Sequence, residues 1–377
     1  MVKYQENDIL RIAKRIKNNR RPYLLVNPLQ AKHIPVSPSK ALQMMKSLGL
    51  LVKEKFSEAR LVIGFAETAT AIGAVVAKTI SDDCLYIHTT RETVKGTKNY
   101  VYFTEEHSHA TEQKIVADCL DSYFSGTETI VLVDDEFSTG KTLINMVNCL
   151  KTQYPSIISK KIVAASIINR LSEDNIQQWR DEGIESICLL KLENSDYSSD
   201  IEGIVVTNAS SYPNEDDLGG SKASLISMTL PDPRVGVIIS EYYASCISGF
   251  DLIRSHCRFW GKSVLILGTE ECMLPALLIG KLIEDTKEAR SIKCHATTRS
   301  PIGISNEPGY PITSGYHISS FYDLQRETFI YNLSSYDIVL IISDAKATDN
   351  QGLSDISRIL KGIGCKEILY LAGDDFV

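Results

Sequence analysis

Residues 130–142, I-V-L-V-D-D-E-F-S-T-G-K-T, decide the fold of this chain. Apolar and mostly β-branched residues run up to Asp134 and Asp135, where acids abruptly replace them. A short Ser/Thr/Gly turn follows, and residues 143–150 have the apolar spacing of a helix. The pattern predicts a buried strand that delivers two carboxylates and a turn to the edge of a sheet.

These acids and the turn favour binding of a sugar phosphate. Asp134 and Asp135 can accept hydrogen bonds from two neighbouring sugar hydroxyls, and the amides and hydroxyls of residues 138–142 can surround a phosphate at a helix N-terminus. Two other interpretations compete. Residues 140–142 resemble the end of a Walker A loop, although Asp135 stands where that loop needs glycine. An ordinary strand, turn and helix cap is the second.

The stretch V-L-V-D-D-E-F-S-T-G-K-T also resembles the phosphoribosyl-diphosphate (PRPP) binding motif of type I phosphoribosyltransferases. That resemblance implies an α/β domain with a parallel, Rossmann-like sheet. It assigns the ribose hydroxyls to Asp134 and Asp135, with Asp135 also a catalytic candidate. It assigns the 5-phosphate to Ser138, Thr139, Gly140, Lys141 and Thr142.

Length and composition predict a two-domain protein of the cytoplasm. The chain has 377 residues, more than one core usually supports, and its net charge of −7 argues against nucleic-acid binding. Its apolar runs are too short to cross a membrane, and its N-terminus lacks the apolar segment of a secretory signal. The nine cysteines form no C-x-x-C pair, which predicts reduced, buried thiols rather than disulfides or a zinc site.

A second loop precedes the acid motif in the chain. Residues 59–64 read as a strand that leads into F-A-E-T-A-T-A, where small side chains let backbone amides approach an anion. Glu67 is either a protein ligand for Mg²⁺ or an acid placed by the dipole in the first turn of a helix. The family resemblance assigns the diphosphate to Ala66, Glu67, Thr68 and Ala69.

Cations follow the next predicted strand, which ends in T-T-R at residues 89–91. Departing diphosphate gains negative charge, so cations beside it stabilise the transition state preferentially. We therefore predict that Arg91 and Lys95 are catalytic, with Arg91 also binding diphosphate, and we take Lys98 for a solvated charge.

Two histidines lie in T-E-E-H-S-H-A-T-E-Q, residues 104–113. The spacing of His107 and His109 does not match a known zinc pattern. They are candidates for acid/base groups or for part of a lid over the reactants. A polar helix N-terminus is the alternative.

The rest of the first half supports a parallel sheet. Residues 161–169 and 187–192 read as strands and residues 173–182 as a helix, an alternation that places ligands at the carboxyl ends of the strands. Nearer the N-terminus, residues 4–18 show a helical pattern. Residues 27–38, with Lys32 and His33, are either a flap over a pocket or a surface connection.

A change of composition predicts the domain boundaries. Polar, Gly- and Pro-rich residues between 207 and 234 read as a linker. We expect a phosphoribosyltransferase domain at 1–207, a linker at 208–233 and a second α/β domain of similar layout at 234–377.

The second half repeats features of the first. An apolar strand ends in Gly268, and Glu271 follows it as Glu67 follows Gly64. T-T-R recurs at residues 297–299, and Ile338 follows Thr297 by 41 positions, as Ile130 follows Thr89. We interpret the second domain as a diverged copy of the first. Because S-D-A-K-A-T-D-N lacks the second acid and the glycine, we expect the copy not to bind the same ribose phosphate.

T-R-S-P at residues 298–301 resembles the signature of the TRSP domain, which follows phosphoribosyltransferase domains in bacterial tellurium-resistance and stress operons. Its candidate functional residues are Glu271, Arg299 and Ser300. The resemblance implies biosynthesis of a nucleoside-like stress metabolite by a Mg²⁺-dependent phosphoribosyltransferase that uses PRPP and an unidentified acceptor. A non-catalytic sensor or scaffold that binds a ribose phosphate or nucleotide is the alternative, and a third possibility is the reverse reaction, phosphorolysis of a nucleotide, at the same site. We expect a homo-oligomer, with enzymes of the same operon as candidate partners and without nucleic-acid or membrane partners.

Overall fold

The computed structural model describes residues 2–16, 18, 21–103, 113–211 and 223–373. These residues form two compact units, and each unit is built from separate stretches of the chain. The first unit comprises Met1–Gln5, Leu42–Ser195 and Pro231–Tyr243, and the second comprises Glu6–Ala41, Asp196–Leu230 and Ala244–Val377.

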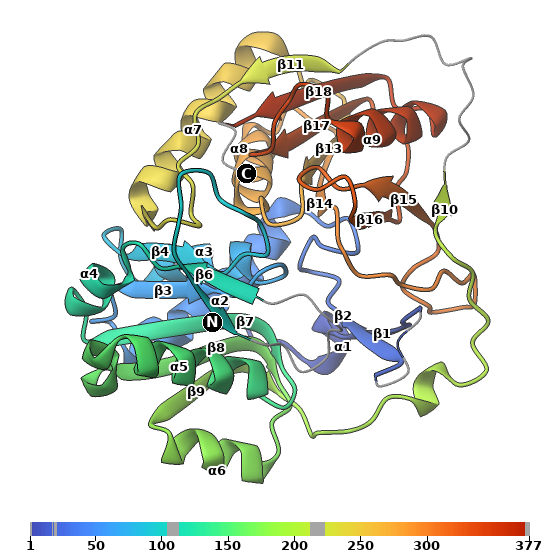
Figure 1. The fold of residues 1–377 in the computed structure, drawn as a ribbon. Coiled ribbons are helices and arrows are strands. Elements are labelled where there is room, and N and C mark those ends of the chain that lie inside the picture. Colours follow the sequence, from blue (N-terminus) through green and yellow to red (C-terminus); the bar gives the residue numbers. More distant parts are fainter. Residues whose placement is uncertain (1, 17, 19–20, 104–112, 212–222, 374–377) are drawn as a thin grey trace. The chain divides into compact units, whose positions relative to one another are not determined.

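The first unit contains a six-stranded sheet in the order β12-β4-β3-β7-β8-β9 (Figure 1), in which β12 is antiparallel to β4 and the other neighbours are parallel. An antiparallel hairpin, β5-β6, accompanies it. The elements of this unit are β3 (Leu61–Gly64), α3 (Thr70–Ile80), β4 (Leu85–His88), β5 (Tyr100–Phe103), β6 (Gln113–Val116), α4 (Leu120–Ser125), β7 (Thr129–Phe137), α5 (Lys141–Gln153), η1 (Pro155–Ser159), β8 (Lys161–Asn169), α6 (Glu173–Asp181), β9 (Ile184–Lys191) and β12 (Val237–Ile238).

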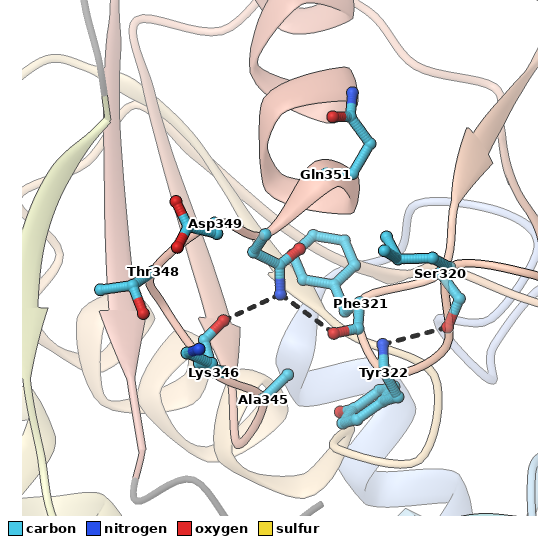
Figure 2. A pocket seen from close by; sticks show the side chains of 10 residues that line it. Ser320, Phe321, Tyr322, Ala345, Lys346, Thr348, Asp349 and Gln351 are labelled. Atoms are coloured by element: carbon cyan, nitrogen blue, oxygen red, sulfur yellow. Dashed lines mark hydrogen bonds between the residues drawn. The ribbon is translucent and has the colours of Figure 1, made fainter.

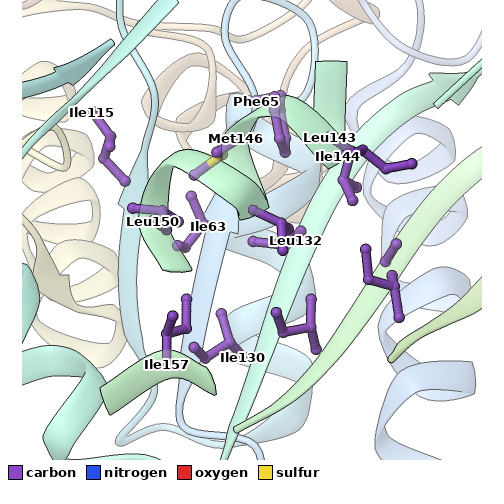
Figure 3. Packing of buried hydrophobic residues seen from close by; sticks show 14 of the residues in the cluster. Ile63, Phe65, Ile115, Ile130, Leu132, Leu143, Ile144, Met146, Leu150 and Ile157 are labelled. Atoms are coloured by element: carbon purple, nitrogen blue, oxygen red, sulfur yellow. The ribbon is translucent and has the colours of Figure 1, made fainter. Parts of the chain in front are cut away.

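Side chains on one face of this sheet pack against α5. Leu143, Met146 and Leu150 of α5 lie among the strand residues Ile63 and Leu132 (Figure 3). All five are almost fully buried, and burial of such side chains is worth roughly 2 kcal/mol each. This packing holds α5 against β7, so the turn between them is fixed at both ends.

The second unit contains a five-stranded parallel sheet in the order β11-β18-β17-β13-β14. It also contains the antiparallel pair β1-β2 and a small sheet, β10-β15-β16. Two helices, α2 (Pro38–Lys55) and α7 (Ile239–His256), have residues in both units. The other elements are α1 (Glu6–Ile9), β1 (Arg11–Lys14), β2 (Tyr23–Val26), η2 (Ser199–Ile201), β10 (Ser210–Ser211), β11 (Ser224–Ser227), β13 (Ser263–Gly268), α8 (Leu274–Thr286), β14 (Ser291–Ala296), β15 (Gly315–Ser319), β16 (Glu327–Tyr331), β17 (Ile338–Ser343), α9 (Gln351–Gly362) and β18 (Glu367–Ala372).

The helix predicted for residues 4–18 is wrong. Only the short α1 is helical, and the following residues form β1, in which Ile12 pairs with Leu25 of β2. Long-range contacts explain the difference, because Arg15 continues the strand in a bridge to Ile302 and Ala13 is fully buried. Tertiary pairing here overrides a helical apolar pattern.

Segments of the two units alternate along the chain, whereas the sequence suggests two consecutive domains. The segment expected to be a linker contains β11, which pairs with β18 at the edge of the second sheet. Residues that follow it supply β12 to the edge of the first sheet, where Val237 pairs with Tyr86. Edge strands offer unpaired backbone groups that a passing segment can satisfy. The boundaries at 207 and 234 therefore differ from those of the compact units.

All nine cysteines are free thiols. Cys119 is exposed, so the prediction of burial is wrong there, while burial raises the pKa of Cys84 to about 11. Within the ranges described above, none of the helices combines the length and the apolar character needed to cross a membrane.

Candidate active site

Three loops leave one edge of the first sheet. β3 lies between β4 and β7, and its last residue, Gly64, pairs with His88 on one side and Val133 on the other. Because these strands are parallel and in register, the residues that follow them emerge together. The sheet thus brings residues 65–69, residues 89–95 and the acid motif to the same edge.

The two acids lie inside β7, which continues as far as Phe137, rather than after its end. Asp134 and Asp135 are both half-buried, and the Asp134 carboxylate accepts a 2.8 Å hydrogen bond from the amide of Asp135. The hydroxyl of Thr68 donates to Asp135 Oδ1 at 2.9 Å. This bond joins the loop predicted to bind diphosphate to the acids predicted to bind ribose.

The turn at residues 138–142 requires glycine at position 140. Gly140 has φ +75°, and a Cβ there would lie 2.6 Å from Trp179 Cζ2. The side-chain amide of Asn175 donates to the Thr139 carbonyl at 2.9 Å, which ties the turn to α6. Lys141 opens α5 and is exposed. The predicted turn followed by a helix is confirmed, and binding of a phosphate there stays a prediction.

The loop after β3 is held by one hydrogen bond to a neighbouring side chain and one within its own backbone. The Ala66 amide donates to Thr89 Oγ1 at 2.8 Å, and the Ala69 amide donates to the Phe65 carbonyl at 3.0 Å. The peptide between Ala66 and Glu67 is cis, and Glu67 is buried. The amides of the two alanines thus support the shape of the loop instead of facing an anion.

The cationic candidates differ in exposure. Arg91 is half-buried immediately after β4, whereas Lys95 is exposed. Both follow the strand that ends at the shared edge. His107 and His109 lie outside the residues that the structure describes.

Oxygen ligands for Mg²⁺ are present but do not form a closed cage. Across the described parts of the chain, no three His, Cys, Asp or Glu side chains group as metal ligands would. Mg²⁺ commonly keeps several waters and uses one or two carboxylates together with substrate phosphates. The carboxylates of Asp134, Asp135 and Glu67 fit that mode of binding.

The second unit repeats this arrangement at the carboxyl end of its strand β13, and we call the end of the central strand and the loop that follows it the corner of each sheet. β13 lies between β14 and β17, and Gly268 pairs with Ala296 and Ile342. Backbone bonds match as well, because the Thr89 amide donates to the Gly64 carbonyl at 2.9 Å and the Thr297 amide to the Gly268 carbonyl at 3.1 Å. This register makes Glu270 the counterpart of Ala66, Glu271 that of Glu67, and Arg299 that of Arg91.

The corner of the second unit is filled by a buried ion cluster. The carboxylate of Glu270, which is 0% exposed, meets Arg299 Nε at 2.8 Å and Arg326 Nη2 at 3.0 Å. Ser320 Oγ donates to Glu270 Oε1 at 2.6 Å, and Arg299 Nη2 lies 3.4 Å from Glu271 Oε1. The structure therefore brings the predicted Glu271 and Arg299 together.

Other predicted and unpredicted residues surround this cluster. Ser300 is adjacent, and its carbonyl accepts from the Tyr331 hydroxyl at 2.8 Å. Sequence reasoning missed Glu270, although the doubled acid in G-T-E-E was a signal, and Arg326, for which the sequence carried none. Lys32 is buried and donates to the Glu270 carbonyl at 2.8 Å, so the interpretation of residues 27–38 as a surface connection is wrong.

The loop after β17 contains a left-handed residue at the position that matches Gly140. Asp349 has φ +55°, and it follows Ile342 by the seven positions that separate Gly140 from Val133. A pocket of about 190 Å³ lies beside this loop, between Tyr322 and Lys346 (Figure 2). Asp344 follows Ile342 by two positions, as Asp135 follows Val133, so the two acids match. The Asp344 carboxylate accepts a hydrogen bond from the Tyr322 hydroxyl of the same unit.

Comparison with protein families divides the chain into two domains. Residues 9–191 match a family described as phosphoribosyl transferase. Residues 251–360 match the TRSP domain, described as C-terminal to that transferase domain. The predicted α/β fold and the predicted order of domains are thereby confirmed. No curated protein matches the chain.

Several solved structures share part of the fold at low identity. Adenine phosphoribosyl transferase from Trypanosoma brucei, in complex with AMP, pyrophosphate and ribose-5-phosphate, is 12% identical with a TM-score of 0.36, and the match covers 48% of this chain and 76% of that one. APRTase from Giardia lamblia, complexed with 9-deazaadenine, is 13% identical with a TM-score of 0.34, and the match covers 49% of this chain and 94% of that one. Orotate phosphoribosyltransferase from Aeropyrum pernix is 16% identical with a TM-score of 0.28, and the match covers 41% of this chain and 72% of that one. TM-scores this low add nothing to the family match.

Proposed function

The chain carries a phosphoribosyl transferase domain followed by a TRSP domain, and we propose that it transfers the ribose 5-phosphate group of PRPP to an acceptor with release of diphosphate. One observation carries this proposal: the ends of β4, β3 and β7 bring an arginine, a small-residue loop and a carboxylate pair with an anion turn to one edge. A single substrate with a sugar diol, a 5-phosphate and a diphosphate needs these three sets of groups together.

The reaction exchanges one bond at C1 of the ribose. The C1–O bond to diphosphate breaks and its electron pair leaves with the diphosphate, and the acceptor then forms a bond to C1 and loses a proton. Asp134 and Asp135 hold the ribose hydroxyls, and Ser138, Thr139, Gly140, Lys141 and Thr142 hold the 5-phosphate. Rigid binding at both ends fixes C1 between leaving group and nucleophile. His107 and His109 remain candidates for taking the proton.

We assign the diphosphate leaving group to residues 66–69 and Arg91. Because the amides of Ala66 and Ala69 donate within the chain, we assign the direct contacts to the backbone of Glu67 and Thr68. Arg91 and Lys95 stabilise the charge that develops on diphosphate as the bond breaks. Mg²⁺, bound mainly through the substrate, would neutralise further phosphate charge, with Glu67 as its candidate protein ligand.

The proposal is tested by incubating the full chain with PRPP, MgCl₂ and fractionated metabolite pools while diphosphate release is measured. We expect tight binding of PRPP and release with at least one fraction. Tight binding without release from any fraction would favour the non-catalytic sensor. No binding of PRPP or ribose 5-phosphate would overturn both functions.

The acceptor and the cellular setting complete the proposal. We propose a nucleoside-like stress metabolite as product, a homo-oligomeric enzyme and a cytoplasmic location, with tellurium resistance as the physiological setting. The nine free thiols suit a reducing compartment. Comparison of growth with and without tellurite in a strain that lacks the gene tests the physiological part separately.

A further inference from the structure

A closed ring of hydrogen bonds holds the first residue of the loop that we assign to diphosphate. The Ala66 amide donates to Thr89 Oγ1 at 2.8 Å, and the Thr89 hydroxyl donates to Gln113 Oε1 at 2.7 Å. Gln113 Nε2 then donates to the Ala66 carbonyl at 2.8 Å. The ring thus engages both backbone groups of Ala66.

The ring is sheltered from water. Thr89 is 0% exposed, Gln113 4% and Ala66 5%. A buried polar group that loses its partner cannot turn to solvent instead, so each of these bonds resists opening. Ala66 is therefore held in one position and one orientation.

The ring connects three separate elements. Ala66 follows β3, Thr89 follows β4, and Gln113 is the first residue of β6 in the hairpin. The loop itself is composed largely of small residues, and Thr68 is also tied to a neighbouring strand through its bond to Asp135. The position of the loop is consequently set from outside, by the neighbouring strand and the hairpin.

The second unit supplies an internal comparison. There the Glu270 amide donates to Thr297 Oγ1 at 2.9 Å, so the bond between amide and hydroxyl belongs to the shared fold. Thr328 stands at the place of Gln113, and Lys32 donates to the Glu270 carbonyl instead. Both units thus fix this peptide, but only the first does so with the neutral amide of a glutamine.

We propose that Gln113, acting with Thr89, is a positioning residue for the bound diphosphate group. It holds the Ala66 peptide so that the backbone of Glu67 and Thr68 faces the leaving group. This inference rests on the proposed function.

Calorimetric titration of Gln113→Met and Thr89→Val with Mg²⁺-diphosphate and, separately, with ribose 5-phosphate tests the inference. We expect diphosphate to bind about tenfold more weakly, the size of one hydrogen bond, and ribose 5-phosphate to bind within about twofold of wild type. Thr127→Val is the matched control, because it removes another buried hydroxyl, one that donates to the Thr129 carbonyl at 2.9 Å. It should change neither affinity.

Each other outcome has a distinct meaning. Unchanged diphosphate affinity, or equal weakening of both ligands, would overturn the positioning role while leaving the proposed function intact. Failure of the wild-type chain to bind either ligand would overturn the proposed function and the inference with it. If Gln113→Met does not fold, Thr89→Ser, which keeps the hydroxyl, should retain the affinity that Thr89→Val loses, and equal affinities for the two would overturn the inference.

Discussion

The two units use the same sheet corner in opposite ways. In the first, the second residue after β3 is Ala66, whose small methyl group brings no charge to this edge, and Asp134 and Asp135 of β7 are half-buried there. In the second, the same position is Glu270, whose carboxylate takes up Arg299 and Arg326 from within the chain. A shared strand order therefore does not imply a shared set of side chains, because the residue at this loop position is a methyl-bearing alanine in one unit and a carboxylate paired with two arginines in the other.

The largest effect separates the matched acids. Asp135→Asn should lower the rate of diphosphate release on the order of 100- to 1000-fold, because the amide removes the negative charge and presents donors to the ribose hydroxyls. Asp344→Asn, its counterpart beside Tyr322, should leave that rate within about twofold of wild type. Steady-state kinetics with PRPP measures both, and equal losses in the two variants would contradict the assignment of chemistry to the first unit.

The ion cluster of the second unit should dominate stability. Glu270→Ala leaves the half-buried Arg299 and Arg326 without the fully buried carboxylate that they share, so we expect a loss of about 3 kcal/mol in the free energy of unfolding. Denaturant titration followed by circular dichroism measures this loss. If Glu270→Ala folds, titration with diphosphate shows whether the corner without the carboxylate binds this anion. The wild-type chain should bind diphosphate at one site. A second diphosphate site in wild type would show that Glu270 does not close the corner.

The two left-handed turn residues give the next contrast. Gly140→Ala should cost about 2–4 kcal/mol, because the residue has φ +75° and the added Cβ would lie 2.6 Å from Trp179. It should also weaken binding of ribose 5-phosphate. Asp349→Gly, at the matching turn with φ +55°, should change stability by less than about 1 kcal/mol. Tolerance of Gly140→Ala would mean that the turn adapts more readily than its packing indicates.

The smallest expected effect depends on pH. Burial lowers the pKa of His295 to about 4, and the side chain occupies the place of Ile87 in the first unit. Between the ordinary pKa of 6.5 and 4 the unfolded chain binds more protons than the folded chain, so stability falls as pH falls through that window. We expect a loss of about 1–2 kcal/mol from pH 7 to pH 5, and a smaller one in His295→Gln. Identical pH dependence in variant and wild type would remove His295 as its source.

Local pattern was sufficient for the elements that carry the site. The apolar run before Asp134, the small-residue run after Gly64 and the T-T-R motif each predicted a strand and the loop that follows it, and the structure contains all three strands with their loops. The left-handed Asp349 could not be predicted, because S-D-A-K-A-T-D-N offers no glycine to signal a positive φ. The helix predicted for residues 4–18 failed because pairing with β2 lies outside any local window.

The sequence by itself determined the central strands of the first sheet, the two domain families and the residues with suitable chemistry, because these depend on local spacing and side-chain type. Only the tertiary structure decided which of those residues meet. In the first unit, hydrogen bonds join Ala66, Thr89 and Gln113. In the second unit, Glu270 lies at the end of the central strand and pairs with arginines. Each sheet also gains an edge strand, β11 from within the expected linker and β12 from just after it. Each of these rests on contacts between residues distant in sequence, whose pairing depends on the packing of whole strands and not on any local pattern.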